Sequence, residues 1–255
     1  HYRLYEFAKT ALIKIFVSPY ATVCDLYSGD IDKWDEAQIG HYIGIDREKW
    51  ESQRKPYTAH FCEFDPCEEN LGFLLQDKDI VCCLQHLQLC FETEERARSF
   101  LYNVSSMLRP GGYFFGITPD SSTIWAKYQK NVEASHNKNQ VPNCIRSESY
   151  MITFEVEEEK FPLFGKKYQL KYANDHCLVH FPSLIRLSRE AGLEFVEIQN
   201  LTEFYDDNRA QFAGMLTFVD NRGRLLPRSL DVLGLYTTFI FQKPDPDAIP
   251  PIMTP

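Results

Sequence analysis

The sequence lacks the features that would place the protein in a membrane or in a secretory route. No apolar run approaches the roughly 18 residues that a membrane-spanning helix needs. Charged residues interrupt the first segment, HYRLYEFAKTALIKIF, where a signal peptide would be apolar. We therefore expect a soluble intracellular protein with no membrane partner.

Basic residues are in the minority. The chain has 27 Lys+Arg against 36 Asp+Glu, which gives a formal net charge of −9. Affinity for long nucleic acids comes mainly from neutralising phosphates, so this balance excludes a protein that coats them. It still allows a protein that binds a short or chemically special nucleic-acid end.

The chain also lacks a metal-binding or redox cysteine motif. Its eight cysteines show no CxxC spacing, and several lie inside apolar runs, where a thiol behaves as a small hydrophobic group. We expect reduced packing residues and no metal site.

The first 120 residues alternate short apolar runs with longer amphipathic stretches. This pattern predicts an α/β fold with a mostly parallel sheet, in which each strand has a helix beside it. The clearest helix spans Thr93–Met107, with Thr93 as N-cap and an exit at Arg-Pro-Gly-Gly. The predicted strands are 22–27, 41–46, 57–64, 79–84 and 112–118.

The pattern changes after residue 145. Segments 150–156 and 168–172 are β-like and predict an inserted antiparallel piece at about 145–180. A helix at 182–191 and strands at 194–201 and 235–242 then complete a seven-stranded sheet. We expect one domain over 1–255, with an irregular proline-rich tail at 244–255.

Three aspartates accompany consecutive predicted strands. Asp25 lies in the first strand, Asp46 ends the second and Asp65 follows the third. Ligands of doubly wound sheets lie beyond the carboxyl ends of the strands. Asp46 is placed to accept both ribose hydroxyls of an adenosine, and Asp65 to accept from the adenine amino group. Each aspartate could instead serve only as a turn or cap residue.

Several segments resemble the mRNA cap guanine-N7 methyltransferases, and the resemblance extends over residues 9–243. The segments are EFAKTALI (6–13), RPGGYFFGITPD (109–120), PLFGKKY (162–168), LVHFP (178–182) and LYTTFIFQK (235–243). Within that family the chain is most similar to a divergent plant form. The resemblance implies a class I (Rossmann-like) fold, S-adenosylmethionine as methyl donor, the capped 5′ end of RNA as substrate and a nuclear location. An activating protein partner is left open.

The resemblance also implies site residues. The methyl donor would be surrounded by Lys9, Asp25, Tyr27, Gly29, Asp46, Asp65, Leu84 and Gln85. The cap would be bound by Tyr5, Glu6, Lys33, Lys49, Gln88, His176 and Tyr236. No catalytic side chain is expected, because guanine N7 has its own lone pair and the sulfonium methyl group is already activated. The lysines could equally be solvated helix residues, and Tyr236 a core aromatic.

Two loops depart from the family pattern. The glycine-rich motif before Lys33-Trp34 is three residues short and reads DLYSGDIDKW, and the segment after Asp46 is about ten residues short. Glycines there let the backbone approach a cofactor closely. Either both segments are deleted in a degenerate enzyme, or mobile loop residues are missing from the numbered chain. Because both gaps fall on cofactor loops, we favour the second explanation.

The cap-facing positions depart as well. Gln88 and Leu89 replace the family's His-Tyr pair, and His176 replaces a glutamate that would bind the guanine edge. Losing that carboxylate could cost about 2 to 3 kcal/mol of cap binding. Two alternatives to a cap methyltransferase therefore stay open: a pseudo-methyltransferase that serves as an RNA- or partner-binding module, and a methyltransferase of another purine.

Overall fold

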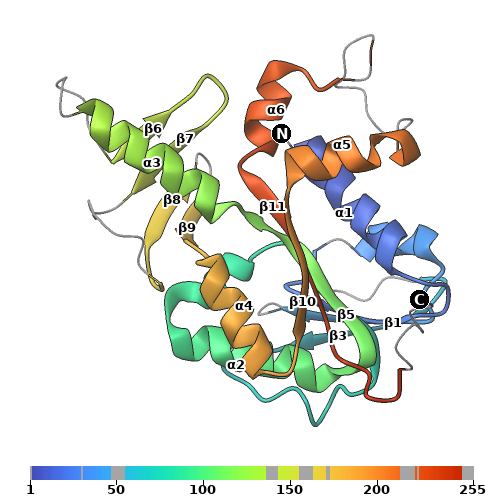
Figure 1. Cartoon of the computed structure of the whole chain (residues 1–255). Coiled ribbons are helices and arrows are strands. Elements are labelled where there is room, and N and C mark those ends of the chain that lie inside the picture. The colour runs from blue at the N-terminus through green and yellow to red at the C-terminus, as the bar shows by residue number, and fades with distance from the viewer. Residues whose placement is uncertain are drawn as a thin grey trace, which may run out of the picture.

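The computed structural model describes residues 2–29, 31–46, 55–135, 143–154, 163–170, 173–212, 222 and 224–248. A seven-stranded sheet with the order β10-β11-β5-β4-β1-β2-β3 forms its centre (Figure 1). Strands β1 to β5 are parallel where they pair, and β11 runs antiparallel between β5 and β10. The strands are β1 Thr22–Leu26, β2 His41–Asp46, β3 Thr58–Glu63, β4 Lys78–Cys83, β5 Leu108–Pro119, β10 Glu194–Asn200 and β11 Tyr236–Gln242.

Helices cover both faces of this sheet. On one face, α2 (Glu94–Met107) and α4 (Phe181–Glu190) bury Phe100 and Leu187 against it. On the other face, α1 (Tyr2–Phe16) and α5 (Leu201–Phe212) bury Leu12 and Phe204. Neighbouring strand residues alternate between the two cores, as the period of a strand requires. The predicted α/β class and the seven-stranded sheet are confirmed.

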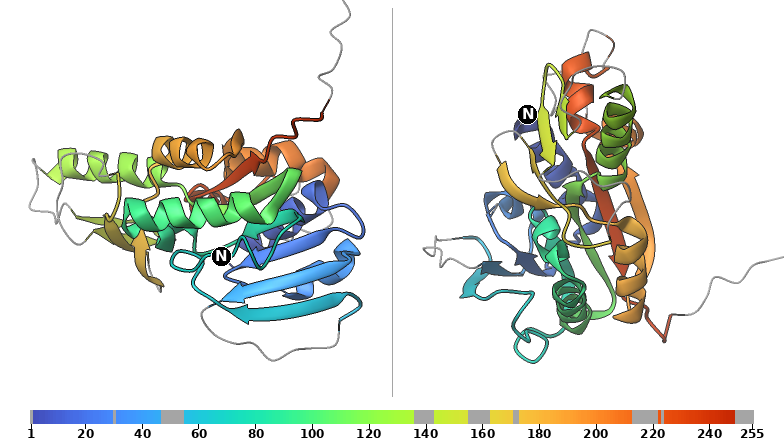
Figure 2. Two further views of the ribbon diagram at one scale, coloured as in Figure 1. Left: turned by 90° about the horizontal axis from the view of Figure 1, so that it is seen from below. Right: turned by 90° about the vertical axis from the view of Figure 1, so that its left-hand side faces the viewer.

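A second, four-stranded antiparallel sheet lies at one end of the large sheet (Figures 1 and 2). It contains β6 (Cys144–Arg146), β7 (Met151–Phe154), β8 (Lys167–Leu170) and β9 (Ala173–Cys177). The helix α3 (Ser121–Ser135) packs on it through a core that includes Trp125, Tyr128, Phe154 and Tyr168. The expected antiparallel insertion is therefore present. Its strands lie within the predicted range of about 145–180, except that β6 begins one residue earlier, at Cys144.

The expectation of a helix beside every strand is wrong in two places. Between β1 and β2 the described residues form only a 3₁₀ helix, η1 (Ile31–Ala37). Between β3 and β4, residues 64–77 form turns rather than a helix. A second 3₁₀ helix, η2 (Leu87–Glu92), follows β4, and α6 (Pro227–Leu233) precedes β11. These connections are held by tertiary contacts, which periodicity does not reveal.

Most of the cysteines pack in the interior, as the sequence predicts. All eight are free thiols, and six of them are buried. No cluster of three or more potential metal ligands occurs among the described residues. Within the same part of the chain, no helix is long and apolar enough to cross a membrane.

Helix α4 begins with a histidine cap that titrates. Nδ1 of His180 accepts a hydrogen bond from the backbone N–H of Ser183 at 3.3 Å. Burial lowers the pKa of His180 below its usual 6.5. The folded state therefore favours the neutral ring, and its contribution is present above about pH 6.5 and lost as the pH falls below that value.

We predict that this cap makes the protein less stable in mild acid. Lowering the pH from 7.5 to 5.5 should lower the free energy of unfolding through His180 by less than about 1 kcal/mol, the usual worth of an N-cap, because solvent screens this partly exposed ring. His180→Asn keeps a capping oxygen that does not titrate, so its loss over the same range should be smaller. Urea unfolding of both proteins at the two pH values measures the difference. Equal pH dependence would show that the cap does not titrate.

Candidate functional site

The carboxyl ends of the central strands converge at one edge of the sheet. Strand β1 lies between β4 and β2, so the segment after β1 is flanked by the ends of both neighbours. The pKa of His86, just after β4, is lowered overall. Burial lowers it most, the charge of Asp46 raises it in part, and the charge of Lys9 lowers it. Both charged groups therefore lie near His86. A Cβ at Gly29 would lie 2.9 Å from Nε2 of Gln85, so these two residues are also in contact.

Two residues at this edge have left-handed backbones. Tyr27 has a φ of 55° and His86 a φ of 73°, and their rings are 6.0 Å apart. Glycine adopts this conformation without strain, whereas tyrosine and histidine adopt it rarely. The strain at non-glycine residues is of order 1 to 3 kcal/mol and clusters at functional sites. Tyr20, Gln38 and Asp77 have positive φ as well, so this backbone feature is in keeping with a ligand site here but does not identify one.

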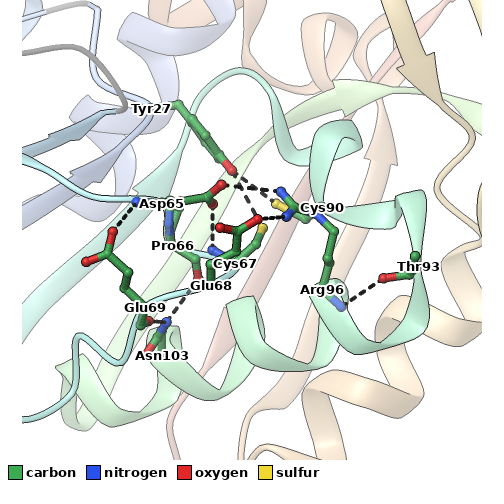
Figure 3. Close-up of polar contacts among 10 residues, drawn as sticks. All are labelled: Tyr27, Asp65, Pro66, Cys67, Glu68, Glu69, Cys90, Thr93, Arg96 and Asn103. Atoms are coloured by element: carbon green, nitrogen blue, oxygen red, sulfur yellow. Dashed lines mark hydrogen bonds and ion pairs between the residues drawn. The ribbon is translucent and has the colours of Figure 1, made fainter.

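The phenol of Tyr27 is buried behind this edge, beside two cysteines. Its oxygen lies 3.6 Å from Sγ of Cys67 and 3.7 Å from Sγ of Cys90 (Figure 3). Tyr27 is only 4% exposed, and burial, together with Cys90 and Cys67, raises the pKa of its hydroxyl. The tyrosine thus packs between the end of β1, the turn after β3 and η2.

Asp25 lies apart from the open edge. It is 2% exposed, and its carboxylate accepts a 2.8 Å hydrogen bond from the hydroxyl of Tyr42 and a 3.4 Å contact from the thiol of Cys82. It therefore links β1 to both neighbouring strands inside the sheet. Any influence of Asp25 on a ligand acts through the position of β1.

Ser28 is a residue that sequence reasoning missed. Its side chain lies against Gly44 of β2, because a Cβ at Gly44 would be 2.8 Å from the serine Oγ. The hydroxyl is buried and has no hydrogen-bond partner among the described residues. An unpaired buried hydroxyl is costly, so Ser28 is an unusual feature of the segment between β1 and β2. Its place in the motif beside Gly29 was the only signal in the sequence.

A second group of predicted residues gathers where α1 meets β4 and β11. The hydroxyl of Tyr5 donates a 2.8 Å hydrogen bond to the carbonyl of Leu84. Its ring packs edge-to-face on Tyr236 at 5.0 Å, and the ammonium of Lys9 lies 5.1 Å from its centroid. Burial raises the pKa of Tyr236 to about 12. The structure thus joins the predicted cap residues of α1 and β11 to the end of β4.

Glu6 connects two lysines of this group. It forms an ion pair with Lys33 of η1 and another, at 3.4 Å, with Lys9. Lys9 is 3% exposed, and burial lowers the pKa of Lys33. The lysines are therefore part of a partly buried charge network and not solvated helix residues.

The remaining predicted residues are placed less fully. Gln88 is buried in η2. His176 is paired in register with Tyr168 between β9 and β8, but its side chain is outside the description. Lys49 and the two short loops, at Asp30 and 47–54, lie outside the described residues. The structure therefore brings several of the predicted residues to one end of the sheet, and the ligand role of every residue in the set stays a prediction.

Asp65 lies in the turn after β3 and is tied to α2. Its Oδ1 accepts a 2.9 Å hydrogen bond from the backbone N–H of Cys67, and its Oδ2 lies 3.5 Å from a guanidinium nitrogen of Arg96 (Figure 3). Arg96 was not among the expected site residues. Nothing in the sequence signals this contact, which forms because α2 packs beside the turn.

The residues present fit an adenosyl ligand with a positively charged sulfur. Carboxylates stand at the end of β2 and after β3, and the unpaired hydroxyl of Ser28 lies beside β2. Acidic oxygens of this kind accept from ribose hydroxyls and from an adenine amino group. The adjoining aromatic pair of Tyr5 and Tyr236 suits a positively charged purine ring.

Comparisons with known proteins agree with this chemistry. A sequence profile of the mRNA (guanine-N(7))-methyltransferase domain matches residues 3–243. The chain is 67% identical over 283 aligned positions to mRNA cap guanine-N(7) methyltransferase 2 of rice (Oryza sativa subsp. japonica), covering 100% of this chain and 84% of that protein. The corresponding protein of Arabidopsis thaliana is 66% identical over 285 positions, covering 100% and 80%. Both alignments are longer than the 255 residues of this chain, so each relative has residues without a counterpart here.

Solved structures show the same fold at low identity. The CcbJ methyltransferase of Streptomyces caelestis superposes with a TM-score of 0.54 at 12% identity, covering 94% of this chain and 90% of that one. The 1,6-didemethyltoxoflavin-N1-methyltransferase of Burkholderia thailandensis, solved with S-adenosylhomocysteine, gives 0.52 at 14% identity, covering 93% and 77%. The class I methyltransferase architecture is confirmed.

Proposed function

Because the chain belongs to the mRNA (guanine-N7)-methyltransferase family, with S-adenosylmethionine as donor and the mRNA cap as acceptor, we propose which of its residues bind each of these two ligands. The edge formed by β1, β2 and β4 binds the methyl donor, and the group around Tyr5 and Tyr236 binds the cap guanine. The observation that carries this division is the hydrogen bond from Tyr5 to the Leu84 carbonyl, which joins the two groups at the end of β4.

On the donor side, Asp46 accepts from the ribose hydroxyls and Asp65 from the adenine amino group. Leu84 and Gln85 line the adenine, and Gly29 allows close approach of the backbone. Lys9, buried beside Glu6, lies between the two ligands. Asp25 acts indirectly, by holding β1 in register with its neighbours.

On the cap side, one ring of the edge-to-face Tyr5–Tyr236 pair stacks on the purine, whose ring becomes positively charged on methylation. Lys33 and Lys49 supply positive charge to the triphosphate, with Glu6 fixing Lys33. Gln88 and His176 take the positions that contact the guanine edge, where each can donate or accept a hydrogen bond. We take 1–255 as a single domain, in which the inserted segment at about 145–180 contributes His176.

Positioning carries the catalysis. When bound, S-adenosylmethionine supplies an already activated methyl group. The residues of the chain hold the guanine so that its N7 lone pair faces that group, and the buried surroundings exclude water. Such approximation can supply roughly 7 to 11 kcal/mol of the barrier, and the acidic field of the pocket suits the dispersal of positive charge. No general base is needed, so none of the histidines is assigned that role.

The proposal extends to location and partners. Capping acts on new transcripts, so we place the protein in the nucleus, acting on the capped 5′ end of RNA. Its net charge of −9 fits contact with a short chemical end rather than with long RNA. An activating protein partner is included as a condition that the assay below tests.

We expect S-adenosylmethionine and its demethylated product to bind the full chain in isothermal titration, and methyl transfer to GpppG-capped RNA in the same samples. Binding with transfer supports the assignment of both ligands. Binding without transfer would indicate another purine substrate, in keeping with Gln88, Leu89 and His176, or a missing activator. Absence of binding would contradict the donor assignment and favour an RNA- or partner-binding module.

A further inference from the structure

The turn after β3 is a rigid platform for Asp65. The backbone carbonyl of Asp65 accepts hydrogen bonds from the N–H groups of Glu68 and Glu69 at 3.1 and 3.0 Å. The N–H of Asp65 donates to the Glu69 carboxylate at 3.2 Å, and Oδ1 of Asp65 accepts from the Cys67 N–H at 2.9 Å (Figure 3). Four hydrogen bonds therefore close this turn on itself.

Helix α2 clamps the turn from one side. The amide of Asn103 donates to the carbonyls of Pro66 and Glu69 at 2.9 and 2.6 Å, and its oxygen accepts from the N–H of Leu71 at 2.9 Å. Arg96 lies seven residues earlier, which is two helical turns and the same face of α2. Asn103 fixes the backbone of the turn, and Arg96 reaches its side chains.

Arg96 bridges two carboxylates of the turn. One guanidinium nitrogen lies 2.7 Å from Oε1 of Glu68, and the other 3.5 Å from Oδ2 of Asp65. The arginine and Asp65 side chains are 18% and 14% exposed, whereas that of Glu68 is 65% exposed. Burial lowers the pKa of Arg96, but Cys67, Asp65 and Glu68 raise it above its usual range. The half-buried pair with Asp65 is screened less by solvent than the exposed pair with Glu68.

We propose that Arg96 is a positioning residue that gives the site its preference for adenine, by holding the Asp65 carboxylate in the orientation that accepts from the 6-amino group. A carboxylate offers about four lone-pair sites. The Cys67 N–H takes one on Oδ1 and Arg96 takes one on Oδ2, so these two contacts together fix the plane of the carboxylate. This inference rests on the proposed role of Asp65 in donor binding.

The test compares two ligands that differ at one group of the purine. S-adenosylhomocysteine has the 6-amino donor, and S-inosylhomocysteine has a carbonyl acceptor at that position. Isothermal titration measures both Kd values on the same preparation, so their ratio does not depend on the fraction of folded protein. The unaltered protein should prefer the adenosyl ligand by about tenfold or more, because a carboxylate meets an amino donor in one case and an oxygen in the other.

Arg96→Gln should lower this preference to about threefold or less, and Arg96→Lys should restore part of it, since lysine supplies a charge without the planar fork. Three matched variants serve as controls. Glu68→Gln removes the shorter ion pair of Arg96, and Arg98→Gln removes an exposed arginine of the same helix that pairs with Glu94 and Glu190. Both should keep the unaltered ratio. Asp65→Asn should abolish the preference.

The outcomes separate this inference from the one it rests on. If Asp65→Asn leaves the ratio unchanged, Asp65 does not contact the purine amino group, and both the assignment and this inference are overturned. If Asp65→Asn abolishes the preference but Arg96→Gln does not lower it, only the role of Arg96 is overturned. A loss in Glu68→Gln equal to that in Arg96→Gln would also overturn it, because the arginine would then act through the turn as a whole.

Discussion

Asp46→Ala should weaken the binding of S-adenosylmethionine about 100-fold. Two hydrogen bonds from ribose hydroxyls to an ionised carboxylate contribute about 1.5 kcal/mol each, and their loss of about 3 kcal/mol corresponds to that factor. Asp46 ends β2 at the edge where Gly29 and His86 also lie. Isothermal titration gives the Kd directly, and the assay with capped RNA should show a raised KM for the donor.

The strand beside Asp46 offers a matched control. Glu63 ends β3, is paired in register with Asp46 and is exposed. Glu63→Ala removes the same charge from the same edge of the sheet and should change the Kd by less than about threefold, because an exposed charge is well screened. Equal losses in both variants would mean that Asp46 acts through the general field, and the assignment of the ribose would fail.

Gly116→Ala should destabilise the fold by about 3 kcal/mol or more, the upper range for overpacking a core. Gly116 is paired with Cys83 of β4 on one side and Phe239 of β11 on the other. A Cβ there would overlap the carbonyl oxygen of Cys83 and lie 2.5 Å from Cζ of Phe239. The backbone cannot yield without shifting the end of β4, where Leu84 and Gln85 begin.

Urea unfolding compares this variant with Gly234→Ala. At Gly234 the nearest atom to an added Cβ is the carbonyl oxygen of Leu230 at 3.3 Å, and the backbone φ of −64° suits alanine. That variant should change the free energy of unfolding by less than about 1 kcal/mol. If Gly116→Ala unfolded at the same urea concentration as the unaltered chain, the close approach of β4, β5 and β11 would be contradicted.

Local patterns predicted most of the regular structure. The strand at 41–46 was placed with its observed ends, and Thr93 caps α2 through the Arg96 N–H as its sequence signature predicts. The sequence also predicted helices between β1 and β2 and between β3 and β4, and the described residues of these two connections form no α-helix. Long-range contacts hold such connections, as the hydrogen bonds from Asn103 do for the turn after β3. Short-range periodicity contains no information about such partners.

The site followed from sequence only in part. The family resemblance placed Tyr5 and Tyr236 on the cap side and Lys9 beside the methyl donor, and the structure brings the Lys9 ammonium to 5.1 Å from the Tyr5 ring. Arg96 and Ser28 were missed. Neither residue type is unusual at its position, and each acquires its meaning from a neighbour on another strand or helix.

The sequence by itself determined the strands of the large sheet, the aspartates at the end of β2 and after β3, and the family to which the chain belongs. These properties follow from residue type and spacing along one segment. Only the tertiary structure decided that Tyr27 adopts a left-handed backbone with its phenol between two thiols, that Arg96 reaches Asp65, and that Gly116 has no room for a side chain. Each of these depends on a distance between segments far apart in the chain, which packing sets and local sequence does not.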